Sequence, residues 1–142
     1  MATAVNNDDV IRRILKMTRT IAVVGLSPNV FRPSHGVARY LQAAGYRIIP
    51  VNPNIVEALG EQAYPDLSSV PESVDLVDVF RRPEFVPEIA EDAIVIGAKS
   101  LWLQDGVVEP ASAARARAAG LDVVMDDCLM RRHRQFAGEL TA

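Results

Sequence analysis

The sequence is poor in the side chains that build disulfides, metal centres and membrane spans. It has one cysteine, Cys128, so no disulfide can form within the chain, as is usual in a reducing compartment. Two histidines and one cysteine are too few for a typical zinc site, so we expect no metal. No apolar run reaches the roughly 18 residues of a membrane helix, and the first residues lack a signal-peptide pattern. We therefore expect a cytoplasmic protein that does not associate with membranes.

Acidic residues are also absent from one long stretch of the chain. None occurs between Asp9 and Glu57, where the chain carries seven basic residues. From Glu57 onward, 8 basic residues face 16 acidic ones, and the net charge of the whole chain is −3. An acidic chain is a poor ligand for nucleic acid, and we expect none to bind. The first third of the chain nevertheless provides a favourable field for a small anionic ligand, although a solvated basic helix face would give the same pattern.

What the sequence does contain is an alternation of apolar runs and helically spaced segments. With 49% hydrophobic and 23% charged residues, it has a globular composition, and its 142 residues correspond to one domain, residues 1–142. Short continuous apolar runs predict strands that are buried on both faces. These strands are expected at 20–24, 46–51, 74–80, 99–103 and 121–125, with a minor one at 62–64.

The segments between the strands favour helices. They are expected after a cap at Asp8 or Asp9, from a cap at Ser34 to Ala44, near 55–59, over 84–97, over 108–119 and from Asp127 onward. Residues 94–96 alone resemble a strand, but Phe85, Ile89 and Ala93 continue into them with helical spacing. Strands that alternate with helices pair in parallel through right-handed crossovers. The predicted fold is therefore α/β: a doubly wound, Rossmann-like parallel sheet of about five strands with helices on both faces.

In such a sheet, ligands bind beyond the carboxyl ends of the strands, so the residues at those ends are the candidates for a site. The loop after the first strand begins at Gly25 and leads to a helix near Ser34. Backbone N–H groups and a helix N-terminus suit a phosphate, and Ser27 and Arg32 add side-chain donors. The alternative is an ordinary strand–helix turn.

The loop does not match the dinucleotide-binding pattern. No second glycine follows Gly25 by two residues, and the second strand ends in Val51, Asn52 and Pro53 without the acid that holds a ribose. These absences disfavour NAD(P). Asn52 and Asn54 offer amide contacts to an adenine or a ribose, or form a turn.

The later strand ends carry further candidates. Arg81 and Arg82 precede a helix start, where two cations are unfavourable unless an anion or an acid lies beside them, and Phe80 offers a face for a base. The alternative is a pair of solvated arginines, or ion pairs to Glu84 and Asp78. Gln104 can hydrogen-bond an amide, whereas Trp102 is more typical of a core. Cys128 lies at the same edge of the sheet, although a buried inert thiol is the commoner case.

Five segments at successive strand ends resemble one known family. They are Val23–Pro28 with Arg32–Gly36, Pro50–Asn54, Asp78–Glu84, Leu101–Gln104 and Val123–Cys128. The pattern is similar to the stand-alone CoA-binding domain proteins, and to the CoA-binding domain of the succinyl-CoA synthetase alpha subunit, over nearly the whole chain. Relatives often have a basic residue in place of Asp127, and a glutamate where Arg131 or Arg132 stands.

The resemblance implies that the chain binds coenzyme A without catalysis of its own, because the phosphorylated histidine of the synthetase belongs to a second domain. It places phosphates at the loop after the first strand, adenosine at 51–54 and 79–82, and pantetheine at 102–104. The expected cofactor-binding residues are Gly25, Leu26, Ser27, Arg32, Ser34, Val51, Asn52, Pro53, Asn54, Val79, Phe80, Arg81, Arg82, Trp102, Leu103 and Gln104.

Two alternatives to a simple binding module stay open. One is an enzyme or subunit that processes acyl-CoA, in which Cys128 or His35 would act on the thioester. The other is a redox sensor in which Cys128 forms a mixed disulfide with CoA. The partner is in each case CoA or acyl-CoA, and a homo-oligomer or a protein partner is compatible with the sequence.

Overall fold

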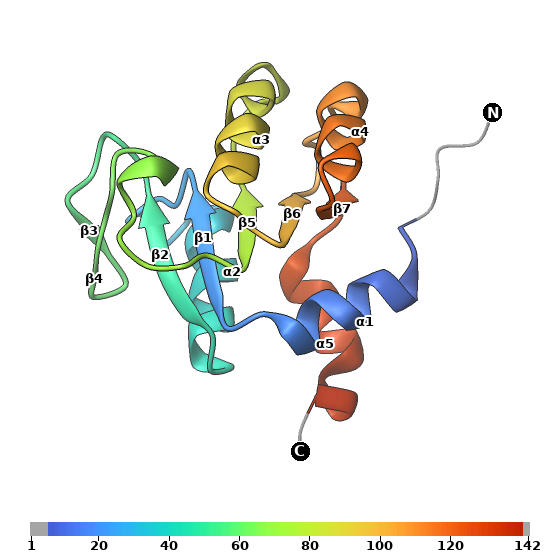
Figure 1. The fold of residues 1–142 in the computed structure, drawn as a ribbon. Coiled ribbons are helices and arrows are strands. Elements are labelled where there is room, and N and C mark those ends of the chain that lie inside the picture. Colours follow the sequence, from blue (N-terminus) through green and yellow to red (C-terminus); the bar gives the residue numbers. More distant parts are fainter. Residues whose placement is uncertain (1–5, 141–142) are drawn as a thin grey trace.

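A computed structural model describes residues 6–140 of the chain. Within these residues, five helices alternate with five principal strands except after the second strand, where a small hairpin and a 3-10 turn replace a helix (Figure 1). In chain order the elements are α1 (Asp8–Met17), β1 (Thr20–Val24), α2 (Pro33–Ala43), β2 (Arg47–Val51), β3 (Glu57–Ala58), β4 (Glu61–Gln62), β5 (Leu76–Val79), α3 (Val86–Val95), β6 (Ser100–Leu103), α4 (Pro110–Ala118), β7 (Asp122–Met125) and α5 (Leu129–Leu140). Short 3-10 turns at Leu67–Ser69 and Pro83–Phe85 precede β5 and α3.

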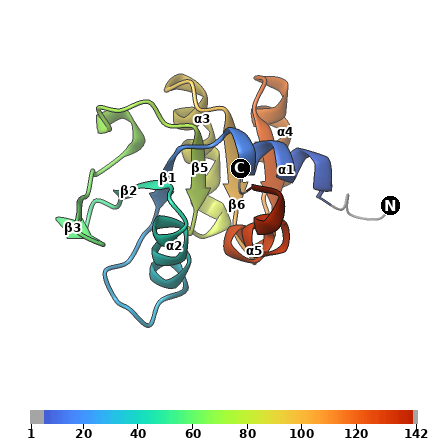
Figure 2. The same cartoon turned by 90° about the horizontal axis from the view of Figure 1, so that it is seen from below.

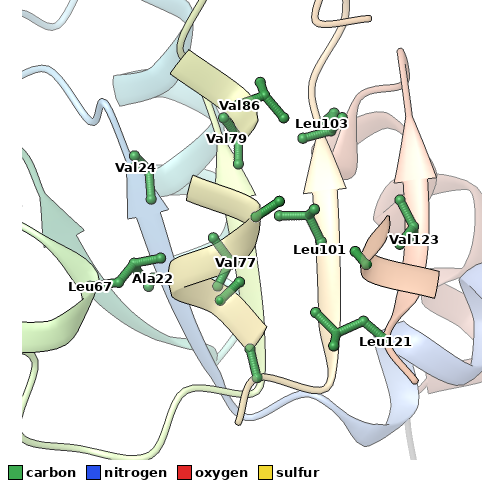
Figure 3. Close-up of a cluster of buried hydrophobic side chains, with 14 of the residues drawn as sticks. Ala22, Val24, Leu67, Val77, Val79, Val86, Leu101, Leu103, Leu121 and Val123 are labelled. Carbon is green, nitrogen blue, oxygen red and sulfur yellow. The ribbon is translucent and has the colours of Figure 1, made fainter. Parts of the chain in front are cut away.

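The five principal strands form one parallel sheet in the order β2-β1-β5-β6-β7. Helices cover both faces of this sheet (Figure 2), which confirms the predicted doubly wound fold. One face packs against α3 and α4 through small residues such as Ala90 and Ala113, and Figure 3 shows this core. The other face packs against α1, α2 and α5 through larger side chains such as Ile14, Leu41 and Phe136.

The order of the strands places a crevice beside β1. The chain leaves β1 through α2 to reach β2, and then returns to the opposite side of β1 to form β5. The connections therefore diverge between β1 and β5. In a doubly wound sheet, such a divergence leaves the carboxyl ends of the two strands free to form a ligand site.

Three local predictions were wrong. Residues 55–59 do not form a helix, because Leu59 and Gly60 both adopt positive φ (55° and 76°) and reverse the chain between β3 and β4. Helix α1 is capped by Asn7, whose side chain accepts hydrogen bonds from the N–H groups of Asp9 and Val10. Helix α2 begins after Arg32 rather than at Ser34, because Pro33 already occupies its first turn.

The centre of the sheet contains an unpartnered acid. Asp78 lies on β5 between Val23 of β1 and Trp102 of β6, and its side chain is fully buried. Neither carboxyl oxygen has a hydrogen-bond partner among the described residues. Burial without compensation disfavours the charged form, so the pKa of Asp78 is raised well above its ordinary value of 3.8.

This raised pKa predicts a pH-dependent stability that Asp78→Asn removes. Above pH 3.8 the folded chain retains a proton that the unfolded chain releases, so folding stability falls as pH rises toward the folded pKa. The slope contributed by one such group approaches about 1.4 kcal/mol per pH unit. Urea unfolding of both proteins at a series of pH values measures it. Parallel curves for Asp78→Asn and the parent chain would contradict the prediction.

Candidate functional site

A cavity of about 620 Å³ opens at the carboxyl ends of the strands, on the face covered by α2 and α5. Its volume is typical of small-molecule sites. Its walls come from the loops after β1, β5 and β6, and from the starts of α2 and α5. The lining residues are Gly25, Ser27, Arg32, Pro33, Ser34, Val37, Phe80, Gln104, Asp105, Val107 and Cys128.

The N-terminus of α2 forms one wall of this cavity and has no side-chain cap. Arg32 occupies the cap position without accepting a hydrogen bond from the first turn, and that turn contains no acid. The Ser34 hydroxyl instead accepts the N–H of Ser27 at 3.0 Å, which fixes the loop after β1. An uncapped helix start beside an arginine without an ion pair in the described chain is a favourable environment for an anion.

Gly25 is the point at which this loop passes closest to the end of β5. Its N–H donates to the Val51 carbonyl at 2.9 Å, and its φ is 89°, a conformation that side chains rarely adopt. A Cβ at this position would lie 2.4 Å from the Phe80 carbonyl oxygen. Only glycine therefore allows the β1 and β5 ends to approach each other in this way.

A second, smaller cavity of about 230 Å³ lies on the other face, next to the same strand ends. Arg81 borders it, and its guanidinium stacks 4.2 Å from the centroid of the Phe85 ring. Arg82 is exposed and pairs with Glu84 at 3.1 Å, so the alternative of an ion pair holds for Arg82. Gly25 borders the larger cavity, and the preceding residue, Val24, borders the smaller one. The two cavities therefore lie on either side of the end of β1.

Five of the remaining predicted site residues have buried side chains. The side chains of Leu26, Val79, Trp102 and Leu103 are completely buried, and Val51 is nearly so. Of these five, Val51 borders the second cavity, whereas the other four line neither cavity, and the Trp102 indole donates to the Asp127 carbonyl at 2.9 Å. Contacts of Leu26, Val79, Trp102 and Leu103 with a ligand would have to come mainly from their backbone atoms.

Asn52 and Asn54 form a turn after β2. The Asn52 amide donates to the Leu26 carbonyl at 3.1 Å, and its oxygen accepts the Asn54 N–H at 2.9 Å. Asn52 thus ties the end of β2 to the loop after β1, and we expect it to hold that loop. Pro53 borders the second cavity, whereas Asn54 is exposed.

The cavity walls also include residues that the sequence did not single out, namely Pro33, Val37, Asp105 and Val107. They are ordinary loop and helix residues, and only their position within a few residues of a strand end or a helix cap marked them. Asp105 accepts hydrogen bonds from Arg131 at 2.9 and 3.0 Å, which lowers the pKa of Asp105 and closes the cavity rim.

Residues 19–134 match the family model for the CoA binding domain, which is most of the chain. The chain belongs to the CoA-binding domain family. Its domain is 42% identical over 123 residues to the uncharacterized protein YneT of Bacillus subtilis (strain 168), covering 87% of this chain and 91% of YneT. A solved structure of a hypothetical protein from Pyrococcus horikoshii OT3 superimposes with a TM-score of 0.90 at 36% identity, covering 97% of this chain and all of the other.

The CoA-binding domain is also 30% identical over 89 residues to the ADP-forming acetate–CoA ligase II of Archaeoglobus fulgidus, covering 61% of this chain. It spans 13% of that ligase, so the ligase contains extensive additional sequence. This likeness relates the small chain to one part of a larger CoA-dependent enzyme.

Two arginines of α5 hold the acid that precedes Cys128. Asp127 is nearly buried and pairs with Arg132 at 2.9 Å and with Arg131 at 3.1 Å. These pairs fix the start of α5 at the end of β7.

Two further observations concern the described residues alone. Between residues 6 and 140, no three His, Cys, Asp or Glu side chains are grouped as ligands for a metal ion. No helix in the same range is long and apolar enough to cross a lipid bilayer.

Proposed function

We propose that this chain binds coenzyme A across the carboxyl ends of β1, β5 and β6. The observation that carries the proposal is the cavity next to Gly25, which the uncapped N-terminus of α2 faces. A CoA-binding domain family and a likeness to acetate–CoA ligases support this choice among phosphate-bearing ligands. A cytoplasmic location is part of the proposal, since a single free thiol fits a reducing compartment.

The chemistry of each wall suggests an orientation for the ligand. The pyrophosphate would lie over Gly25, where backbone approaches closely and where Arg32 and the start of α2 provide positive charge. The adenosine would occupy the second cavity, next to Pro53 and to the Arg81 guanidinium. The pantetheine arm would then run along the larger cavity toward Gln104.

The same features disfavour NAD(P). The turn after β2 uses Asn52 to hold the neighbouring loop, and residues 52–54 offer no carboxylate at the position where a dinucleotide-binding domain holds the ribose hydroxyls, although Asp66, Glu88 and Asp92 line the second cavity. Neither cavity combines a nucleophile with a hydrogen-bonded base among its described residues. We therefore propose a binding module rather than an autonomous enzyme.

Calorimetric titration with CoA, acetyl-CoA, NAD and ATP tests the proposal. A few charge-assisted hydrogen bonds at about 1.5–3 kcal/mol each suffice for micromolar affinity after the costs of association. We expect saturable binding of CoA near the micromolar range and no binding of NAD. Equal affinities for CoA and acetyl-CoA would support a binding module, whereas turnover of acetyl-CoA would contradict it. Absence of CoA binding would overturn the proposal.

Arg32 and Arg81 should each contribute more to CoA affinity than Arg82 does. Arg32 and Arg81 border the cavities without an ion-pair partner in the described chain, so Arg32→Ala and Arg81→Ala should each weaken CoA binding about 10-fold, the equivalent of about 1.4 kcal/mol. Arg82→Ala, which removes a solvent-exposed pair with Glu84, should change affinity less. Arg115→Ala on α4 is the matched control, because Arg115 pairs with Glu91 away from both cavities. Equal affinities of all four variants would remove Arg32 and Arg81 from the site.

A further inference from the structure

The larger cavity is bordered by an amide group that the protein does not fully pair. Gln104 is 4% exposed, and its Oε1 accepts the Leu129 N–H at 3.1 Å. This bond fixes the orientation of the amide, because only the oxygen can accept. The Nε2 group makes no hydrogen bond within residues 6–140 and, unlike the Asp78 oxygens, is not sealed off from the cavity that the Gln104 side chain borders. It can therefore donate to a ligand or to water in the cavity.

Cys128 borders the same cavity. It is a free thiol, 6% exposed, and it immediately precedes α5. Its N–H donates to the Asp127 Oδ1 at 2.9 Å, which holds the residue against the end of β7. The thiol is therefore largely shielded from bulk solvent, but a ligand bound in the cavity could reach it.

A cationic side chain lies close to Cys128. Arg131, in the first turn of α5, pairs with Asp105 of the cavity wall and with Asp127 next to Cys128, and its pKa is raised first by its hydrogen bonds to Asp105. The start of α5 adds a positive dipole end at the same place.

We propose that Cys128 undergoes thiol–disulfide exchange with the disulfide of CoA, and that Gln104 positions the pantetheine arm for this reaction. The inference rests on the proposed function, because the nucleotide of CoA brings its sulfur to the far end of the cavity. Gln104 Nε2 would donate to a carbonyl oxygen of the arm.

The step balances without a further reactant. Cys128 gives its proton to solvent, and its thiolate attacks one sulfur of the CoA disulfide. The disulfide bond of the reagent breaks as the protein–CoA bond forms, and the second CoA leaves as a thiolate that takes up a proton. The protein thiol is oxidised, and one of the two CoA molecules is reduced.

Mass spectrometry of the purified chain after incubation with CoA disulfide tests the inference. We expect a single CoA adduct on Cys128 that dithiothreitol removes and that Cys128→Ser abolishes. The adduct should form at least 10-fold faster than the adduct with glutathione disulfide at equal concentration, because only CoA can use the nucleotide site. Acetyl-CoA, which has no free sulfur, should slow the reaction by competition.

Gln104→Glu separates positioning from reactivity. It keeps the oxygen that accepts the Leu129 N–H but removes the amide donor, so exchange with CoA disulfide should slow about 10-fold. The rate of alkylation by iodoacetamide reports the intrinsic reactivity of Cys128 in both proteins. An equal loss in both rates would mean that Gln104 acts on the thiol itself rather than on the pantetheine arm.

Titration of the wild-type chain with CoA under reducing conditions distinguishes a failure of the exchange reaction from a failure of the proposed CoA binding. CoA binding without an adduct, or with an adduct that forms no faster than that of glutathione, would overturn the exchange and leave the proposed function intact. Absence of CoA binding to the reduced chain would overturn both.

Discussion

Gly25→Ala is expected to reduce CoA affinity by at least about 100-fold, which corresponds to about 2.7 kcal/mol of binding free energy. The new Cβ would lie 2.4 Å from the Phe80 carbonyl oxygen, far inside van der Waals contact. The ends of β1 and β5 would have to separate, and this movement would displace the loop over which the pyrophosphate is proposed to lie. The positive φ of 89° adds about 1–2 kcal/mol of conformational strain, so folding stability should fall as well.

Gly97→Ala is the matched control for this prediction. Gly97 also has a positive φ, 77°, but none of the surrounding atoms lies within 4 Å of its Cβ position. It follows α3 and precedes β6, so it lies near the amino ends of the strands, away from the candidate site. It should show the conformational strain without the loss of CoA binding. Urea unfolding and CoA titration of both variants separate the two effects. If Gly25→Ala folds and binds CoA as Gly97→Ala does, then the close approach at Gly25 does not shape the ligand site.

The fold could be predicted from the sequence because each strand is a short apolar run that ends at a polar or glycine-containing loop. The segment before Gly97 shows the strength of periodicity over local composition. Ile94, Val95 and Ile96 form the last turn of α3 and its cap rather than a strand, and Val95 is 82% exposed. The helical spacing that begins at Phe85 was therefore the better guide.

Local details depended on tertiary contacts and could not be predicted in the same way. The helix expected at 55–59 is replaced by a hairpin because β4 packs beside β2, a contact that the spacing of Ile55 and Leu59 does not reveal. Likewise, the sequence left open whether Asn52 contacts a ligand or forms a turn, and it gave no sign that the Asn52 amide donates to the Leu26 carbonyl, 26 residues earlier in the chain.

The sequence indicated where the candidate site lies but not which side chains border its cavity. The carboxyl ends of parallel strands meet at one edge, which brings Gly25, Phe80 and Gln104 together around one cavity. The sequence could not indicate which side chains would point into the cavity. Trp102 lies within β6 and Gln104 directly follows the strand, yet the first is in the core and the second borders the cavity.

The ion pair at the start of α5 should be the most stabilising in the described chain. Asp127→Ala is expected to destabilise the fold by about 1.5–3 kcal/mol, because it removes the buried carboxylate that accepts from the Arg132 guanidinium, 17% exposed, and leaves that guanidinium with the half-exposed Asp8 as its ion-pair partner. The same substitution removes the acceptor of the Cys128 N–H at the helix start, worth about 1 kcal/mol. Chemical denaturation of the purified variant measures the loss.

Asp105→Ala provides the comparison, since Asp105 makes a well-formed pair with Arg131 in which both side chains are more than half exposed. Solvent screens that pair, so its loss should remove less than about 1 kcal/mol. Arg132→Ala should then have a smaller effect in the Asp127→Ala background than in the parent chain, because Arg132 has already lost its buried partner and keeps only Asp8. If Asp127→Ala and Asp105→Ala were equally mild, the stability at the start of α5 would come from the apolar packing of Leu129 and Phe136 and not from the ion pair.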